Sequence, residues 1–133
     1  MPRRGSRHTQ AYQDELTDLV NRRDYELRLA ELLEGEYQFA KGAVVALELD
    51  DMRLLNRVHG FAAGEHILRV VAQTAREVFA AVPVSILARN NEFSFSFVLV
   101  ELTHAEVAEL AGELRRRVIE QLGDLCGDGG ATR

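Results

Sequence analysis

Apolar residues recur at helical spacing in four stretches of the chain. Three stretches are long, and the apolar positions of each form one stripe that a helix can bury against a core. The fourth stretch is short and carries Leu54, Leu55 and Val58. We therefore expect a short helix there and long helices over residues 22–34, 62–79 and 104–122.

Residues that start or stop helices flank these stretches. Asn21 can cap the first helix, and Gly35 suits its C-terminal end. Pro83 stops any continuation of the helix before it, and Thr103 with Glu106 forms a capping box for the last helix. Local chemistry and periodicity thus predict the same helix ends.

Two further patterns predict strands. Residues 43–49 are almost continuously apolar, which favours a central strand covered on both faces. Residues 84–87 and 93–100 are also strand-like. The second of these places one set of side chains on a single face, namely Phe93, Phe95, Phe97 and Leu99.

A turn should join the last two strands at residues 89–92. Asparagine tolerates the positive φ that hairpin turns often need, and two asparagines lie there. The order of elements is helix, strand, two helices, hairpin and helix. It predicts an α+β sandwich with helices packed on a mainly antiparallel sheet.

One domain should account for most of the chain. Residues 1–10 are polar and basic, and residues 123–133 are rich in glycine, so we expect flexible ends around a domain of residues 11–122. The length of 133 residues, with 47% hydrophobic and 28% charged residues, suits a single globular core.

Charge and hydropathy exclude several classes of function. A net charge of -5 argues against general affinity for nucleic acid or an anionic membrane surface. No apolar run approaches the roughly 20 residues that cross a bilayer, and the N-terminus lacks the apolar stretch of a secretory signal. Cys126 is alone, so no internal disulfide can form. We expect a cytoplasmic domain, either free or as part of a membrane-anchored protein.

Two stretches carry motifs of a known family. Residues 14–25 read D-E-L-T-D-L-V-N-R-R-D-Y, similar to D-x-L-T-G-L-x-N-R-R-x-F of GGDEF domains. Residues 48–65 read E-L-D-D-M-R-L-L-N-R-V-H-G-F-A-A-G-E, similar to D-x-D-x-F-K-x-x-N-D-x-x-G-H-x-x-G-D. The resemblance extends to about residue 122 and implies the palm-like sandwich of nucleotide cyclases.

The resemblance stops before the family's last strand. GGDEF domains continue past their last helix into a further strand that completes the sheet. This sequence instead reads G-D-G-G at residues 127–130. We therefore expect the C-terminal strand to be lacking and the chain to be a fragment of a longer protein.

The motif that names the family, R-x-G-G-D-E-F, is altered in this chain. A gapless match at Arg89 places Phe93 at the metal-binding acid, whereas a match at the final E-F places Asn91 there. Neither register supplies the two glycines that let a nucleotide approach the backbone. The degenerate signature turn consists of Arg89, Asn90, Asn91, Glu92 and Phe93.

The family's chemistry indicates what such a turn has lost. A diguanylate cyclase joins two GTP molecules, each held by one domain of a dimer, with magnesium on hard oxygen ligands. By resemblance Glu48 takes the first metal position, the Leu49 carbonyl the second, and Asp50 the second acid of D-x-D. Because the third ligand is missing, we interpret Glu48 and Asp50 as vestigial metal positions and expect neither a bound metal nor catalytic residues.

Three further residues match nucleotide positions of the family. Asn56 matches the guanine-binding asparagine, Glu65 replaces its aspartate, and Arg53 replaces a phosphate-binding lysine. A purely structural interpretation stays open, in which Asn56 caps or crosses a turn, Glu65 lies in the first turn of a helix where its charge suits the helix dipole, and Arg53 is solvated.

These features predict a catalytically inactive GGDEF domain that acts as a regulatory or protein-interaction module in bacterial cyclic di-GMP signalling. It most resembles the GGDEF half of GGDEF–EAL receptor proteins. The inhibitory product site R-x-x-D is absent, because its positions fall on Val82 and Ser85 or on Ala80 and Pro83. Expected partners are an EAL or other domain of the same protein, a separate protein, or a second copy. Two alternatives remain, an active cyclase that uses magnesium and a GTP-binding allosteric domain without turnover.

Overall fold

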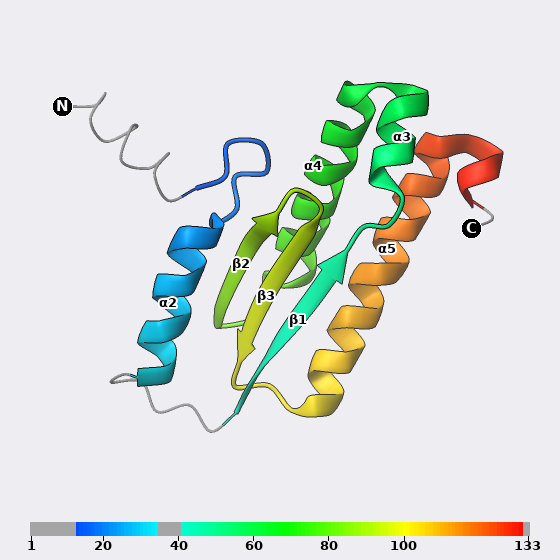
Figure 1. Cartoon of the computed structure of the whole chain (residues 1–133). Coiled ribbons are helices and arrows are strands. Elements are labelled where there is room, and N and C mark those ends of the chain that lie inside the picture. The colour runs from blue at the N-terminus through cyan, green and yellow to red at the C-terminus, as the bar shows by residue number, and fades with distance from the viewer. Residues whose placement is uncertain (1–12, 35–40, 132–133) are drawn as a thin grey trace.

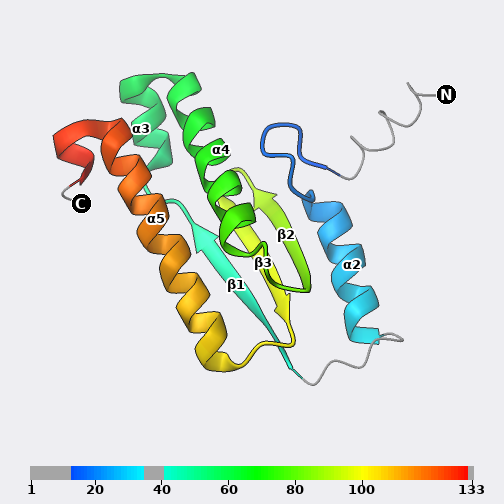
Figure 2. The ribbon, with the colours of Figure 1, turned by 180° about the vertical axis from the view of Figure 1, so that it is seen from behind.

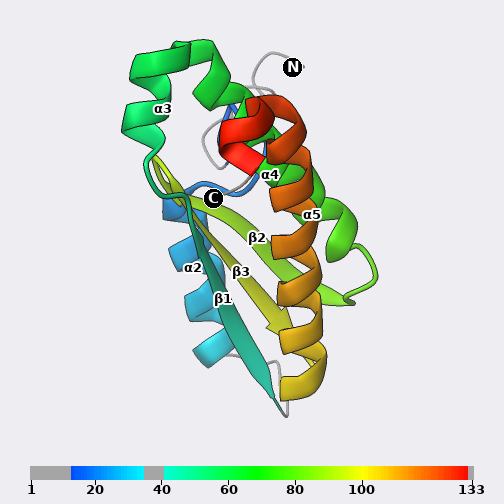
Figure 3. The ribbon, with the colours of Figure 1, turned by 90° about the vertical axis from the view of Figure 1, so that its right-hand side faces the viewer.

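The computed structural model describes residues 13–34 and 41–131, in which helices cover both faces of a three-stranded sheet (Figure 1). The elements follow the predicted order: α2 (Arg22–Glu34), β1 (Gly42–Glu48), α3 (Met52–His59), α4 (Phe61–Val78), β2 (Val84–Asn91), β3 (Ser94–Val100) and α5 (His104–Ala131). Helices α4 and α5 lie on one face and α2 on the other (Figures 2 and 3). The α+β architecture predicted from the sequence is confirmed.

The central strand is β3, not β1. The sheet has the order β1-β3-β2, and both pairings are antiparallel. Residues 95–100 of β3 are all buried, whereas along β1 exposed and half-buried residues alternate, and Val44 is 54% exposed. The prediction of a central strand at residues 43–49 is therefore wrong. An apolar run does not reveal whether a neighbouring strand or helix covers it. Helix α2 packs against β2 and β3 and lies away from β1 (Figure 1).

The main core lies between the sheet and the pair α4 and α5. Phe95, Phe97 and Leu99 are almost fully buried there, as their alternation along the strand predicted. The rings of Phe79 and Phe97 lie 5.3 Å apart, which joins the end of α4 to the middle of the sheet. Each such side chain contributes roughly 1.5–3 kcal/mol through burial. A smaller cluster on the opposite face packs Tyr25 of α2 against β2 and β3.

Both predicted helix caps are confirmed. Asn21 Oδ1 accepts a hydrogen bond from the backbone N–H of Asp24 at 2.9 Å. At the start of α5, Glu106 accepts from the N–H of Thr103 at 2.7 Å, and the Thr103 hydroxyl accepts from the N–H of Glu106 at 3.1 Å. The proposed end of α2 at Gly35 lies outside the described residues.

Helix α5 is longer than predicted. It continues through Ala131, so residues 123–131 are helical rather than part of an irregular tail. Glycine costs about 1 kcal/mol per residue in a helix interior, but extending a helix that has already formed needs no new nucleus. No described helix is long and apolar enough to cross a membrane.

The hairpin turn is shorter than predicted. Strand β2 continues through Arg89 and Asn90 to Asn91, so only Glu92 and Phe93 form the turn. No asparagine of the described chain has a positive φ. Instead, Asn91 Oδ1 accepts hydrogen bonds from the N–H of Phe93 at 3.3 Å and the hydroxyl of Ser94 at 2.7 Å. The side chain closes the turn, so no left-handed residue is required there.

Candidate functional site

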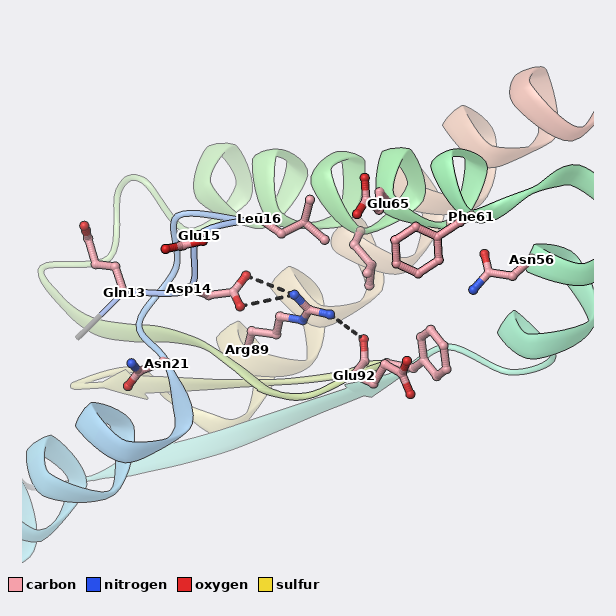
Figure 4. Close-up of a pocket in the computed structure, with 13 residues that line it drawn as sticks. Gln13, Asp14, Glu15, Leu16, Asn21, Asn56, Phe61, Glu65, Arg89 and Glu92 are labelled. Atoms are coloured by element: carbon pink, nitrogen blue, oxygen red, sulfur yellow. Dashed lines mark hydrogen bonds and ion pairs between the residues drawn. The ribbon is translucent and has the colours of Figure 1, made fainter. Parts of the chain in front are cut away.

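A cleft of about 510 Å³ opens between the loop before α2, the start of α4 and the tip of the β2–β3 hairpin (Figure 4). These elements are far apart in the sequence and meet at one end of the sheet. The lining residues are Gln13, Asp14, Glu15, Leu16, Asn21, Asn56, Phe61, Gly64, Glu65, Leu68, Arg89, Glu92 and Phe93.

The loop before α2 is held by its own side chains and by α4. The Asp14 carboxylate accepts hydrogen bonds from the N–H of Thr17 at 2.9 Å and from its hydroxyl at 2.7 Å. Asp18 has φ 64°, at the position where the family motif has glycine. Arg76 of α4 donates two hydrogen bonds, at 3.1 and 2.8 Å, to the carbonyl of Thr17. The loop is therefore fixed before any ligand enters.

Arg89 joins this loop to the hairpin tip. Its guanidinium donates to both oxygens of Asp14 at 3.1 Å, to the Glu92 carbonyl at 3.0 Å and to the Asn91 carbonyl at 3.3 Å (Figure 4). Burial raises the pKa of Asp14, but the hydrogen bonds from Thr17 and Arg89, with the charge of Arg89, outweigh this and lower the pKa overall. The pair keeps its charge and clamps the two segments together.

The hairpin tip presents Glu92 and Phe93 to the cleft. Glu48 pairs with Ser94 at the end of β1, and the N–H of Leu49 donates to the Phe93 carbonyl at 3.0 Å. Glu48 and Asp50 are exposed and do not line the cleft. Across the described part of the chain, no three His, Cys, Asp or Glu side chains gather where they could hold a metal ion.

Two of the three nucleotide positions meet in the cleft. Asn56 and Glu65 both line it, whereas Arg53 is exposed and does not. The Asn56 side chain does not cap a turn. Its Oδ1 is buried without a hydrogen-bond partner, and a Cβ added at Gly64 would lie 2.0 Å from that oxygen. Glycine at position 64 lets Asn56 approach α4 closely.

The sequence did not predict the contact between Asp14 and Arg89, nor the place of Phe61 in the site. The ion pair of Asp14 with Arg89 joins motif residues that are 75 positions apart, and their shared membership of family motifs was the available signal. Phe61 lines the cleft with 69% of its surface exposed. Phe61 comes after Leu54, Leu55 and Val58, the apolar positions of α3, so the hydrophobic pattern alone suggested no role for it in a binding site.

A comparison with protein-family models shows to which family the chain belongs. Residues 11–128 match the model described as "Diguanylate cyclase, GGDEF domain". The chain therefore belongs to the GGDEF family.

Relatives agree with this assignment. An uncharacterized signaling protein of Caulobacter vibrioides is 33% identical over 114 residues, which cover 84% of this chain and 14% of that protein. The GGDEF domain with coiled coil of DgcB from Caulobacter crescentus, solved in complex with c-di-GMP, is 25% identical, with a TM-score of 0.72 over 85% of this chain and 59% of that one. LapD of Vibrio cholerae, solved as an S helix-GGDEF-EAL chain bound to c-di-GMP, has 20% identity and a TM-score of 0.72 over 92% of this chain and 28% of that one.

Proposed function

We propose that this chain is a catalytically inactive GGDEF domain that serves as a regulatory or protein-interaction module in bacterial cyclic di-GMP signalling. The observation that carries the proposal is the hairpin tip, where Glu92 and Phe93 form the turn. Arg89 pairs with Phe95 across the strands, and Phe95 is 1% exposed. In the gapless match this buried Phe95 is the family's final phenylalanine, and Phe93 replaces its metal-binding acid.

The residues present do not fit the magnesium that the family implies. Magnesium needs hard oxygen ligands in near-octahedral order. Here the oxygen donors near the tip are the exposed carboxylates of Glu48 and Glu92 and the carbonyl of Leu49, and no three such side chains of the described residues gather into a metal site. In the gapless match the family's third metal position carries the ring of Phe93. A ring supplies no ligand and occupies the space, so we derive no catalytic step through a metal.

The charges in the cleft also disfavour a nucleoside triphosphate. Among the described residues that line it, Arg89 is the one cation, and Asp14 and two carbonyls already occupy its guanidinium. Phosphate binding in proteins depends on free cationic or N–H donors. Arg53, the residue at the family's phosphate-binding position, does not line the cleft.

A role within a larger signalling protein fits the length of the relatives. The chain spans 14% of the Caulobacter relative and 28% of the LapD chain, in which a GGDEF domain is followed by an EAL domain. A domain without turnover can still transmit a conformational change to a neighbour. We therefore propose an EAL or other domain of the same protein, or a separate protein, as its partner.

Incubation with GTP and magnesium, followed by chromatography for cyclic di-GMP, tests the proposal. We expect no product from this chain under conditions in which an active family member converts its GTP. Product at a rate comparable with that positive control would end the proposal in favour of a working cyclase.

A second candidate is a domain that binds GTP without turnover. The presence of Asn56 and Glu65 in one cleft favours it. Calorimetry with GTP on the wild type and on Asn56→Ala distinguishes the candidates, because only nucleotide binding predicts heat that this substitution abolishes.

A further inference from the structure

The outer edge of β1 is open. The carbonyl of Lys41 accepts a hydrogen bond from the N–H of Glu101 at 2.9 Å, and the N–H of Leu49 donates to the carbonyl of Phe93 at 3.0 Å. Backbone groups alternate in direction along an antiparallel strand, so the odd-numbered residues bond to β3 and the even-numbered ones point away from it. The outward residues are Gly42, Val44, Ala46 and Glu48. No described residue pairs with their backbone N–H and C=O groups.

The other edge of the sheet is covered. Val20, in the loop before α2, accepts from the N–H of Arg89 at 2.9 Å and donates to the carbonyl of Leu87 at 3.0 Å. The register of β2 also shifts between Arg89 and Asn91, and such irregularities protect an edge from further pairing. Strand β1 lacks both features, because its register with β3 is regular over Gly42–Glu48 and it contains no proline. Of the two edges, that of β1 can therefore pair with another strand.

Helix α5 overhangs the open edge. It lies beside β1 on the side away from β3, on the same face of the sheet as α4 (Figures 1, 2 and 3). Arg117 and Gln121 of α5 hydrogen-bond to Glu77 and Thr74 of α4. Ile119 lies two positions from each, which is about 200° round the helix, so it is on the flank that faces away from α4. Its side chain is 47% exposed, and a strand beside β1 would lie under this flank.

The sequence of β1 suits a strand with neighbours on both sides. A nearly continuous apolar run is typical of such a strand, yet Val44 is 54% exposed and Ala46 is also exposed. A strand added at the open edge would bond to the outward backbone groups and give Val44 a cross-strand neighbour. It would also give Ile119 an apolar contact. The open backbone groups and the exposed apolar side chains thus favour the same kind of ligand.

A second copy of the chain does not fit this place. Two β1 strands in antiparallel pairing are related by a two-fold axis perpendicular to the sheet, so both copies of α5 would overhang the same edge from the same face. Paired strands lie about 4.8 Å apart, whereas packed helices need about 8–10 Å between their axes. The two helices would overlap. A single strand that brings no helix of its own to this face fits.

We propose that the open edge of β1 and the adjoining flank of α5 bind a β-strand that a partner polypeptide presents. This inference deepens the proposed function, on which it rests, by naming the form in which the partner is bound. Hydrogen bonds to the backbone of β1 supply affinity, and Ile119 selects apolar side chains at alternate positions of the bound strand. The other face of that strand lies beside the exposed Val44 and Glu48 and meets solvent, so it suits polar side chains.

Chemical-shift titration and hydrogen exchange of the isotope-labelled chain test this inference. The probe is the capped peptide Lys-Val-Thr-Val-Thr-Val-Lys, which alternates apolar and polar side chains. In the free chain we expect the amides of Val44 and Ala46 to exchange much faster than that of Val45, which bonds to β3. The peptide should slow the exchange of Val44 and Ala46 about tenfold or more and shift the amide signal of Ile119.

Two modified peptides separate strand pairing from apolar contact. One carries N-methyl groups on its valines and the other on its threonines, so each lacks the N–H donors along one edge and both keep every side chain. In a bound strand only one of these edges faces β1. One modified peptide should therefore bind about tenfold more weakly than the parent or not at all, and the other should bind nearly as well.

Variants of the chain locate the binding. Val44→Pro removes an outward N–H that β3 does not use, and an edge strand tolerates proline at such a position. It should abolish peptide binding, whereas Val44→Ala should weaken it only slightly. Ile119→Ser should weaken binding several-fold. Leu27→Ser is its matched control, because Leu27 is 53% exposed on α2, away from β1. Circular dichroism shows whether each variant is folded, and the modified peptides test the wild type independently of any variant.

Several results would overturn the inference. These are no shifts at millimolar peptide, equal binding of the two modified peptides, full binding by folded Val44→Pro, or slow exchange of Val44 and Ala46 in the free chain. Sedimentation that shows a dimer, dissociated by Val44→Pro, would assign the edge to a second copy and overturn a separate partner. Formation of cyclic di-GMP tests the proposed function separately, so the two can fail independently.

Discussion

The base and the tip of the β2–β3 hairpin place the same residue type in opposite roles. Phe95 belongs to the base and is 1% exposed in the main core. Phe93, two positions earlier, lies in the turn, is half-buried and lines the cleft. Both follow the alternation that predicted a single buried face. The strand pairing ends between them. Periodicity therefore describes the base fully, whereas at the tip it predicts that Phe93 packs against the core but not that Phe93 also lines the cleft.

The largest expected effect separates these two phenylalanines. Phe95→Ala should lower the free energy of unfolding by about 3–5 kcal/mol, because it opens a cavity in a closed core. Phe93→Ala should lower it by about 1–2 kcal/mol, since solvent already reaches that ring. Urea denaturation of both variants measures the difference, and equal losses would mean that the tip is as much a part of the core as the base.

The next effect concerns the clamp that joins the tip to the loop before α2. Arg89→Ala removes the ion pair with Asp14 and two hydrogen bonds to tip carbonyls, so we expect a loss of about 2–3 kcal/mol. Arg22→Ala is the matched control, because its pair with Glu26 is exposed and should contribute less than about 0.5 kcal/mol. Similar losses from both variants in urea denaturation would contradict a structural role for the clamp.

The sequence predicts local features of the fold better than the arrangement of its strands. The starts of α2 and α5 follow from local signals, namely Asn21 and the pair Thr103 and Glu106, and the structure confirms both caps. The position of β1 at the edge of the sheet depends on what lies beside it, which no local pattern encodes.

The site was predicted in part. Family motifs identified Asn56 and Glu65, which line the cleft, but also Arg53, Glu48 and Asp50, which do not. The pairing of Asp14 with Arg89 joins residues 75 positions apart, so only the fold brings it about.

A smaller effect should appear when the clamp is titrated. The pKa of Asp14 is lowered from 3.8 in the folded chain, so the carboxylate stabilises the fold above that value and loses its contribution as the pH falls through the folded pKa. The stability difference between the wild type and Asp14→Asn should therefore be largest at neutral pH and shrink towards pH 3. Urea denaturation at both pH values measures it.

A substitution elsewhere serves as the control for this titration. Asp50→Asn removes a carboxylate that is exposed and lies outside the cleft. Its effect on stability should change much less between the two pH values. If Asp14→Asn and Asp50→Asn show the same pH dependence, the hydrogen bonds from Thr17 and Arg89 do not lower the pKa of Asp14 in the folded chain.

The smallest effect isolates the closure of the turn from the clamp. Asn91 accepts hydrogen bonds from the Phe93 N–H and the Ser94 hydroxyl, and it is exposed, so Asn91→Ala should cost about 0.5–1 kcal/mol. Asn91→Asp keeps an acceptor at the same position and should retain most of that stability. Thermal unfolding of the two variants decides between a side-chain closure and a turn held by Arg89 alone. In the second case both variants would match the wild type, and the tip would depend entirely on its link to Asp14.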